Sequence, residues 1–268
     1  MEIQAIRTPI IQANQSLLNV FVSSLADTLQ ERTIVCVTSK VVAVEQGRII
    51  KLSEIKPTPE AYRLKTRRFT DDLTNETEFA ELVRCEADRV FDGVEEPGYV
   101  FLTLKDNILV ANAGIDLSNV PKGYAILWPA EPWAWAADFA ARLKQHYGLA
   151  ELGVLLTDSN VKPLRRGVTG VAVAYSGFMG IQSKIGHSDI YGNALKFTEK
   201  AAADALATAA VFIMGEAAEQ TPFALIKHAP VTFTDLPADP AESYFAPKYD
   251  LFAGIYNREF LDEGSDPD

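Results

Sequence analysis

The chain has 268 residues, 48% of them hydrophobic and 23% charged, which is typical of a globular protein with one or two domains. Its formal net charge of -11 and its pI near 4.8 exclude a general nucleic-acid binder, because such a protein needs a basic face for the phosphates. No apolar run approaches the roughly 20 residues that cross a bilayer, and the first residues lack a signal-peptide pattern. Two cysteines without metal-like spacing indicate buried, reduced thiols in a cytoplasmic protein.

The first fifty residues predict short strands and one helix. Residues 2–7 alternate weakly and residues 33–37 form a continuous apolar, β-branched run, so both are expected to be strands. Between them, residues 15–30 carry apolar side chains four apart, the spacing of a helix with one buried face. After Thr38-Ser39-Lys40 the strand pattern resumes in residues 41–50, with a glycine as the expected turn.

Residues 51–93 have a different character, because they are charged, compatible with helices and poor in glycine. We expect two helices there that form a lobe or cover, the second over residues 76–91. The segment also holds a basic cluster, which a solvated helix face explains better than an anion site does. This cluster consists of Arg63, Lys65, Arg67 and Arg68.

The rest of the chain predicts strands and helices in irregular order. A hairpin is expected around Lys105-Asp106-Asn107, and a helix from Pro132 to Gly148. Strands are also expected over 99–104, 108–112, 152–157, 168–176, 223–228 and 231–234, a helix over 194–214, and a disordered tail over 262–268. The irregular order favours an α+β fold over a doubly wound sheet, in a single domain of residues 1–268. The helix is nearly apolar over 205–214, so the core or a second subunit should cover both of its faces.

Three segments place a carboxylate where regular structure is expected to end, at Asp116, Asp158 and Glu216. Hard divalent cations take oxygen ligands from several segments, so these groups and the Ser159 hydroxyl would form a metal site if the fold gathers them. The alternative is that Asp116 and Asp158 cap turns through hydrogen bonds to their own backbone, which is the more frequent role of a single aspartate.

Phosphate binding has no familiar glycine-rich motif here, since neither GxGxxG nor GxxxxGK[ST] occurs. Thr38-Ser39-Lys40 could offer backbone donors, a hydroxyl and a cation to phosphates, or could be a solvated loop. Arg165 and Arg166 could hold a carboxylate or phosphate through paired N–H donors, or could be ordinary surface charges. For His187 a structural or surface role is favoured over that of a catalytic base.

Several segments, taken in order, resemble the γ-glutamyl ligases of the deazaflavin coenzyme F420. They are TSKVV and EQGR (38–48), NAGIDLSNV (112–120), TDSN and RRG (157–167), DIYGNAL (189–195) and MGE (214–216). Each piece is short, but their order and spacing extend from the N-terminus to about Lys227. The chain departs from its apparent relatives at Val44, Gln46, Val161-Lys162 and the residues that follow Glu216.

The resemblance implies a mixed α/β fold of this family's own type, with antiparallel strands, a helical lobe and an intertwined homodimer. It also implies GTP as a substrate, Mg²⁺ or Mn²⁺ at two sites, help from a monovalent cation such as K⁺, and the addition of L-glutamate to a cofactor precursor. By the same resemblance, Asp116 and Asp158 would bind one divalent ion, and Ser159 and Glu216 would help to hold a second.

The resemblance also implies which residues would contact GTP. They are Thr8, Pro9, Ile10, Ile11, Ser39, Asn119, Met214, Gly215, Glu216, Ala217, Ala218, Glu219, Gln220 and Thr221, with Lys40 beside them to meet phosphate. In the expected reaction the acceptor's carboxylate attacks the γ-phosphate of GTP, and the amino group of glutamate displaces phosphate from the acyl phosphate. Arg165 and Arg166 would orient a carboxylate, which is our own assignment. Two alternatives stay open, namely a ligase for another cofactor such as folate and a catalytically silent nucleotide- or cofactor-binding homologue.

Overall fold

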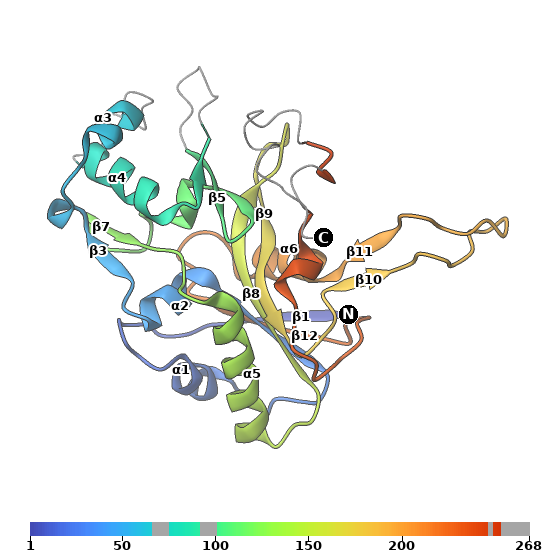
Figure 1. The fold of residues 1–268 in the computed structure, drawn as a ribbon. Coiled ribbons are helices and arrows are strands. Elements are labelled where there is room, and N and C mark those ends of the chain that lie inside the picture. Colours follow the sequence, from blue (N-terminus) through green and yellow to red (C-terminus); the bar gives the residue numbers. More distant parts are fainter. Residues whose placement is uncertain (66–74, 92–100, 246–248, 253–268) are drawn as a thin grey trace. The chain divides into compact units, whose positions relative to one another are not determined.

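The computed structural model (Figure 1) describes residues 1–65, 75–91, 101–245 and 249–252. The chain divides into two compact units, and both are built from more than one stretch of sequence. The first unit comprises residues 1–47 and 129–243, and the second comprises residues 48–128 and the residues from 244 onward. No helix of the described residues is long and apolar enough to cross a membrane.

The first unit is built on a five-stranded sheet in the order β1-β12-β2-β8-β9. Its strands are β1 (Glu2–Ile6), β2 (Thr33–Thr38), β8 (Leu152–Val161), β9 (Val168–Ser176) and β12 (Phe223–Lys227). Strands β2 and β8 are parallel, and the other three neighbouring pairs are antiparallel. The prediction of a mixed structure with antiparallel strands, and not of a doubly wound sheet, is therefore confirmed.

Helices pack on both faces of this sheet. They are α1 (Leu17–Ser24), α2 (Ser39–Glu45), α5 (Pro132–Tyr147) and α6 (Ala202–Met214). The side chains of β12 alternate between the two faces of the sheet. Ala224 and Ile226 pack with α6 on one face, and Phe223 contacts Phe21 of α1 on the other. Phe21 also meets Phe139 of α5 edge to face, and Figure 1 shows α5 in front of the sheet and α6 behind it. Cys36 is buried on the α6 face, whereas Cys85 is exposed, so the prediction of buried thiols holds only for Cys36.

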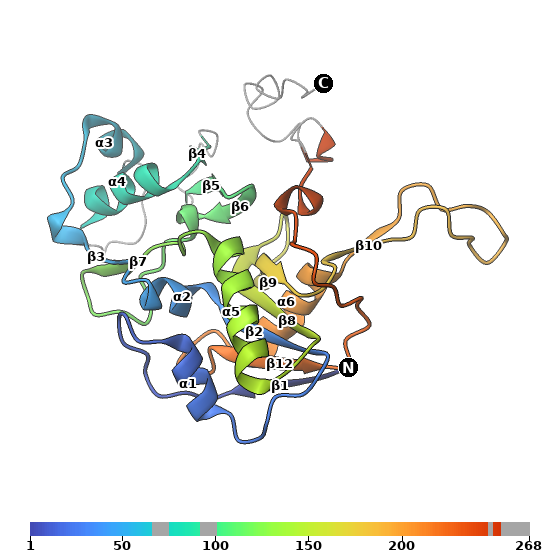
Figure 2. The same cartoon turned by 60° about the horizontal axis from the view of Figure 1, so that its bottom comes forward.

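A two-stranded ribbon extends from the first unit, as Figures 1 and 2 show. Its strands are β10 (Ile181–Ser183) and β11 (Glu199–Ala201), and residues 184–198 form the loop between them. Asp189 organises the loop, because its carboxylate accepts hydrogen bonds from the Asn193 side chain and from backbone N–H groups, which lowers the pKa of Asp189. The loop exposes large apolar side chains, among them Ile190 (91% exposed), Tyr191 (83%) and Phe197 (89%).

The second unit combines small sheets with the predicted helices. Its elements are β3 (Ile49–Lys51), α3 (Pro59–Lys65), α4 (Glu76–Glu86), β4 (Arg89–Val90), β5 (Leu102–Lys105), β6 (Ile108–Ala111) and β7 (Tyr124–Ile126), with the 3-10 turns η1 (Leu52–Glu54) and η2 (Asn112–Gly114). Strand β3 pairs with β7, and β5 pairs with both β4 and β6. The apolar side of α4 packs against Leu52, Ile115 and Leu127 in the core of this unit.

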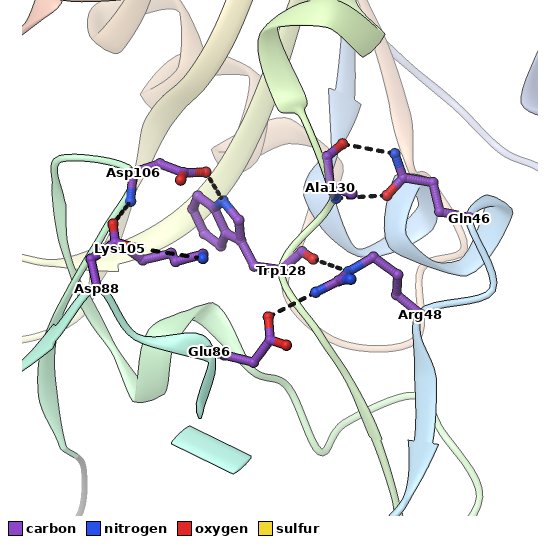
Figure 3. A network of polar contacts seen from close by, with 8 residues as sticks. All are labelled: Gln46, Arg48, Glu86, Asp88, Lys105, Asp106, Trp128 and Ala130. Atoms are coloured by element: carbon purple, nitrogen blue, oxygen red, sulfur yellow. Dashed lines mark hydrogen bonds and ion pairs between the residues drawn. The ribbon is translucent and has the colours of Figure 1, made fainter. Parts of the chain in front are cut away.

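Polar contacts reinforce the points where the chain enters and leaves the second unit (Figure 3). Arg48 donates to the backbone oxygen of Trp128 (2.6 Å) and to the Glu86 carboxylate (2.7 Å), and the Trp128 indole donates to Asp106 (2.8 Å). Within the first unit, the Gln46 side chain donates to the Ala130 oxygen (2.9 Å) and accepts from its N–H (2.8 Å). The side-chain amide carries both a donor and an acceptor, so it pairs with the oxygen and the N–H of one residue, and Gln46 has a structural use here.

Most predicted elements form. The strands at 2–7, 33–37, 168–176 and 223–228, the helix from Pro132 and the hairpin around Asp106-Asn107 are confirmed. Two helices form within 51–93 as predicted, but the second ends at Glu86 and not at residue 91, because residues 89–90 pair as β4. The hairpin turn has φ of 48° and 59° at Asp106 and Asn107, the left-handed values that a two-residue turn requires. The prediction of strand from residue 41 was wrong, because Ser39–Glu45 is the helix α2 and buries Val42, Ala43 and Val44.

Other boundaries differ from the prediction for identifiable reasons. The helix expected over 15–30 is limited to Leu17–Ser24, with Ser16 as its N-cap, and the helix expected over 194–214 begins at Ala202 because residues 199–201 pair as β11. Residues 231–234 form no strand, since Phe233 makes a single bridge with Phe178. Arg67, Arg68 and the tail 262–268 lie outside the described residues.

Glu81 of α4 is a buried acid of the second unit and holds the start of α3. Its carboxylate accepts from the Arg84 guanidinium (2.6 Å), and from the backbone N–H (3.0 Å) and hydroxyl (2.6 Å) of Thr58. These bonds, the one from Arg84 above all, lower the pKa of Glu81 to about 2 although its burial acts in the opposite direction. Thr58 directly precedes α3, so Glu81 caps one helix from another.

Stability of the second unit should therefore depend on acid pH. A folded-state pKa below the unfolded value of about 4.3 adds stability above that pH, and this stability is lost as the pH falls towards 2. We expect Glu81→Gln to lower the free energy of unfolding by about 1–3 kcal/mol at pH 7 and by progressively less below pH 4. Urea unfolding from pH 7 to pH 3 measures this, with exposed Glu54→Gln as the control. A difference that does not change with pH would contradict the assignment.

Candidate active site

The strand directions of the first unit bring four distant segments to one edge of its sheet. Strands β1, β2 and β8 run the same way and β12 runs opposite to them. Their carboxyl ends therefore lie beside the amino end of β12, to which the loop after α6 leads. The segments that meet at this edge are residues 7–11, 38–40, 158–161 and 214–222. Three of the predicted GTP-contact segments are among them.

Hydrogen bonds show that these segments are direct neighbours. The Thr8 N–H donates to the Gln220 oxygen (2.8 Å), and the Thr38 N–H donates to the Pro222 oxygen (3.0 Å). Thr8 and Ser39 are both buried, with 5% of each residue exposed. The loop after α6 is thus tied to the chain after β1 and to the end of β2. Thr157, which the sequence did not single out, joins β8 to β2 through its hydroxyl and the Val37 oxygen (3.2 Å).

Ser159 and Glu216 are in direct contact at this edge. The Ser159 hydroxyl lies 2.7 Å and 2.9 Å from the two carboxylate oxygens of Glu216. Gly170 explains how α6 brings Glu216 so near, because it lies opposite Ser159 on β9 and a Cβ there would stand 2.3 Å from the Ala207 oxygen. The glycine therefore lets the helix backbone rest on the sheet at a distance that a Cβ would prevent.

Asp158 lies on the other face of β8. The prediction that the strand ends at Thr157 was wrong, because β9 pairs with β8 as far as Val161. Successive side chains of a strand alternate, so Asp158 and Asn160 face away from Ser159 and α6. One oxygen of the half-buried Asp158 carboxylate accepts from the Ser159 N–H (2.9 Å). A local cap and a ligand function are both compatible with this contact.

The loop from Met214 to Thr221 is organised by its own contacts. Gly215 has a φ of 83°, which favours glycine, and the Glu219 carboxylate accepts from the Ala217 N–H (2.8 Å). The Thr221 hydroxyl donates to the Met214 oxygen. Residues 215–220 are exposed while Met214 is buried in the core. The loop thus presents its backbone to solvent from a fixed base.

The second unit carries two of the predicted site residues, Asp116 and Asn119. Asp116 exchanges two backbone hydrogen bonds with Ile126 (2.9 Å each), and its carboxylate accepts from the Ser118 N–H (2.6 Å). The latter is the local turn that the sequence offered as an alternative. Asn119 is exposed and has a φ of 57°, which asparagine tolerates better than most residues. Asp116 and Asn119 belong to the second unit, whereas the strand edge belongs to the first.

The two arginines and His187 have exposed positions. Arg165 and Arg166 lie in the turn between β8 and β9, a few residues beyond Asp158 and Ser159. His187 lies in the loop of the β10–β11 ribbon, so the strand edge does not gather it. Of the positions that depart from the family pattern, Val44 is buried and Gln46 is engaged by Ala130.

The oxygen atoms of Ser159 and Glu216 at the strand edge are of the kind that a hard divalent cation binds. In the described part of the chain no three His, Cys, Asp or Glu side chains are gathered closely enough to hold a metal on their own. Mg²⁺, however, keeps several waters and is usually bound by one or two carboxylates together with substrate phosphates. Ser159 and Glu216 supply a hydroxyl and a carboxylate side by side, and such an incomplete oxygen set fits an ion that arrives with a nucleotide.

Comparison with known proteins shows that the molecule is a ligase that forms carbon–nitrogen (amide) bonds. The family model described as "F420-0:Gamma-glutamyl ligase" matches residues 5–228, and the chain belongs to this family. Proteins named "Coenzyme F420:L-glutamate ligase" are similar to most of this chain. That of Methanopyrus kandleri is 34% identical over 199 residues, 74% of this chain and 76% of its own. That of Methanothermobacter thermautotrophicus is 32% identical over 228 residues, which are 83% and 86% of the two chains.

Proposed function

We propose that the protein joins the amino group of L-glutamate to a carboxylate of the coenzyme F420 precursor F420-0 through an amide bond, with GTP as the energy source. The observation that carries the proposal is the family match over residues 5–228, which includes all of the segments gathered at the strand edge. The expected activation step is attack of the acceptor carboxylate on the γ-phosphate of GTP, which yields GDP and an acyl phosphate. The amino group of glutamate then attacks the acyl carbon, and inorganic phosphate leaves as the amide forms.

The proposal assigns GTP to the loops that meet at the edge. Residues 8–11, Ser39 with Lys40, and the loop 214–221 are neighbours in the first unit, and Thr8 is bonded to Gln220. Exposed backbone in the loop after α6 supports a role in phosphate binding, because backbone N–H groups can donate to phosphate oxygens. Asn119 of the second unit is assigned to GTP on the resemblance alone.

Metal binding is assigned to oxygen donors. Ser159 and Glu216 would hold one Mg²⁺ or Mn²⁺, and Asp158 with Asp116 would hold another, the latter by resemblance. When bound, divalent ions neutralise charge on the phosphoryl group in transfer, and K⁺ would assist as a monovalent ion. Assignment of Asp158 and Ser159 to different ions is supported by their opposite directions on β8. Arg165 and Arg166 would orient a carboxylate of the acceptor or of glutamate.

We further propose that two copies of the chain form a homodimer. Helix α6 is apolar over its whole second half, and it exposes Phe212 (85%) and Ile213 (46%) on the first unit. Adjacent large apolar side chains left in water on one helix favour a protein interface. Light scattering should give twice the chain mass of 29.4 kDa, and Phe212→Glu should shift it towards one chain. A monomeric mass for the unaltered protein would contradict the dimer.

An assay of product and phosphate release tests the proposed reaction. Purified protein is incubated with labelled glutamate, GTP, Mn²⁺ and either F420-0 or folate, and product mass is measured. We expect glutamylated F420-0 with one phosphate released for each glutamate added. Turnover with folate alone would move the activity to another cofactor. Absence of product with both acceptors, together with tight GTP binding, would identify a silent binding protein and end the proposal.

A further inference from the structure

The turn between β8 and β9 contains an unusual leucine. The Arg165 N–H donates to the Lys162 oxygen (3.1 Å), which closes a four-residue turn with Pro163 and Leu164 at its centre. Proline suits the second position of such a turn, but the third position has a φ of 56°, where glycine or asparagine is normally found. Leu164 therefore occupies a backbone conformation that leucine rarely adopts.

The Leu164 side chain makes no packing contact with the described chain that would stabilise the fold. Leu164 is 105% exposed, so its side chain packs on no other part of the described chain. The other non-glycine residues with positive φ in the described ranges are polar or charged, except Ala113, which is buried. Leu164 thus combines a strained backbone with an apolar side chain in water. Strain of this kind is retained at functional sites more often than elsewhere.

Cations surround the leucine in a strongly acidic protein. Lys162, Arg165 and Arg166 are all exposed, and within the described ranges no ion pair engages them. The chain as a whole has a net charge of -11, so this turn is a local positive centre. Cations that form no ion pair within the described residues attract anionic ligands.

The turn is near Ser159, which the proposed function assigns to metal binding. Lys162 follows Ser159 by three residues, and a strand advances about 3.3 Å per residue, so the two lie about 10 Å apart. A large acceptor whose reacting carboxylate is near Ser159 and Glu216 would therefore reach the turn with its other groups. GTP is assigned to the chain after β1 and β2 and to the loop 214–221 before β12, whereas the turn lies between β8 and β9.

We propose that this turn selects the acceptor. Lys162 binds an anionic group of the acceptor other than its reacting carboxylate, beside Arg165 and Arg166, which orient a carboxylate, and Leu164 packs against the acceptor's ring system. The turn is thus a specificity determinant that favours a large acceptor with both an apolar ring and additional negative charge. This inference depends on the proposed ligase function and adds the acceptor residues Lys162 and Leu164 to it.

Kinetics of two variants test the inference. With F420-0 as the acceptor, Lys162→Ala should raise the KM for F420-0 about tenfold, the effect of one charge-assisted hydrogen bond, while kcat and the KM for GTP change less than about twofold. Leu164→Asn should also raise the KM for F420-0 about tenfold. Its Tm should be unchanged or higher, because asparagine tolerates this backbone conformation. Lys56→Ala, which removes an exposed cation of the second unit, is the matched control.

The outcomes separate this inference from the proposed function. An unchanged KM for F420-0 in both variants of an active enzyme would overturn the role of the turn and leave the ligase function intact. If a variant changes the oligomeric mass and leaves the KM for F420-0 unchanged, the role of the turn is overturned as well. If the unaltered enzyme forms no product, the proposed function fails, and equilibrium dialysis of F420-0 then tests the turn directly. Equal binding by the unaltered protein and Lys162→Ala, or no binding by either, would overturn it too.

Discussion

Replacing Asp158 with asparagine is expected to lower metal-dependent glutamate ligation by on the order of 1,000-fold without unfolding the protein. The substitution removes a negative charge from the strand edge, where the proposal places a divalent ion. It preserves the local structure, because asparagine keeps the oxygen that accepts from the Ser159 N–H (2.9 Å). The surrounding strand pairs, from Thr157 with Ala172 to Val161 with Val168, do not depend on the charge.

Two measurements check this result. Product formation is followed over a range of Mn²⁺ concentrations, and Mn²⁺ binding is measured separately by the shift in Tm that the ion produces. The control is Asp138→Asn, which removes an exposed carboxylate of α5 that pairs with Arg142 at 3.4 Å. This control should retain full activity. Normal turnover and an unchanged Mn²⁺-induced shift in the Asp158 variant would remove Asp158 from the metal site.

The largest expected loss of stability comes from Gly177→Ala. Gly177 has a φ of 84°, which a residue with a Cβ adopts only under strain, and that Cβ would lie 2.0 Å from the Leu152 oxygen. Because the clash involves backbone at the start of β8, a side-chain movement cannot relieve it. Strain and overlap together should lower the free energy of unfolding by about 3 kcal/mol or more.

Gly148→Ala separates the two causes. Gly148 ends α5 in the same unit with a φ of 68°, but a Cβ there would meet nothing within 4 Å. Its replacement should cost about 1–2 kcal/mol, the effect of backbone strain alone. Urea unfolding of both variants measures the difference. Equal losses for the two would show that the contact between Gly177 and Leu152 does not constrain the fold.

Local signals in the sequence determined a large part of the structure. The β-branched run at 33–37, the helix bounded by Pro132 and Gly148, and the turn at Asp106-Asn107 depend on residues that are adjacent in the chain. Such signals do not require knowledge of distant partners, so they were predictable. The family motifs were also read directly, and the family match over residues 5–228 agrees with them.

Only the tertiary structure decided what required distant partners. Val42 and Val44 lie in a helix because the surrounding core buries them, although their β-branched side chains favour strands. Strand β8 continues beyond Thr157 because β9 pairs with it, and this pairing places Asp158 and Ser159 on opposite faces.

The candidate site depended on the same kind of partner. Ser159 meets Glu216, 57 residues further along, because α6 packs closely on Gly170. The sequence by itself therefore determined which residue types and motifs this ligase carries. The pairing of strands and the packing of α6, which depend on contacts between residues far apart in the chain, decided which of them meet.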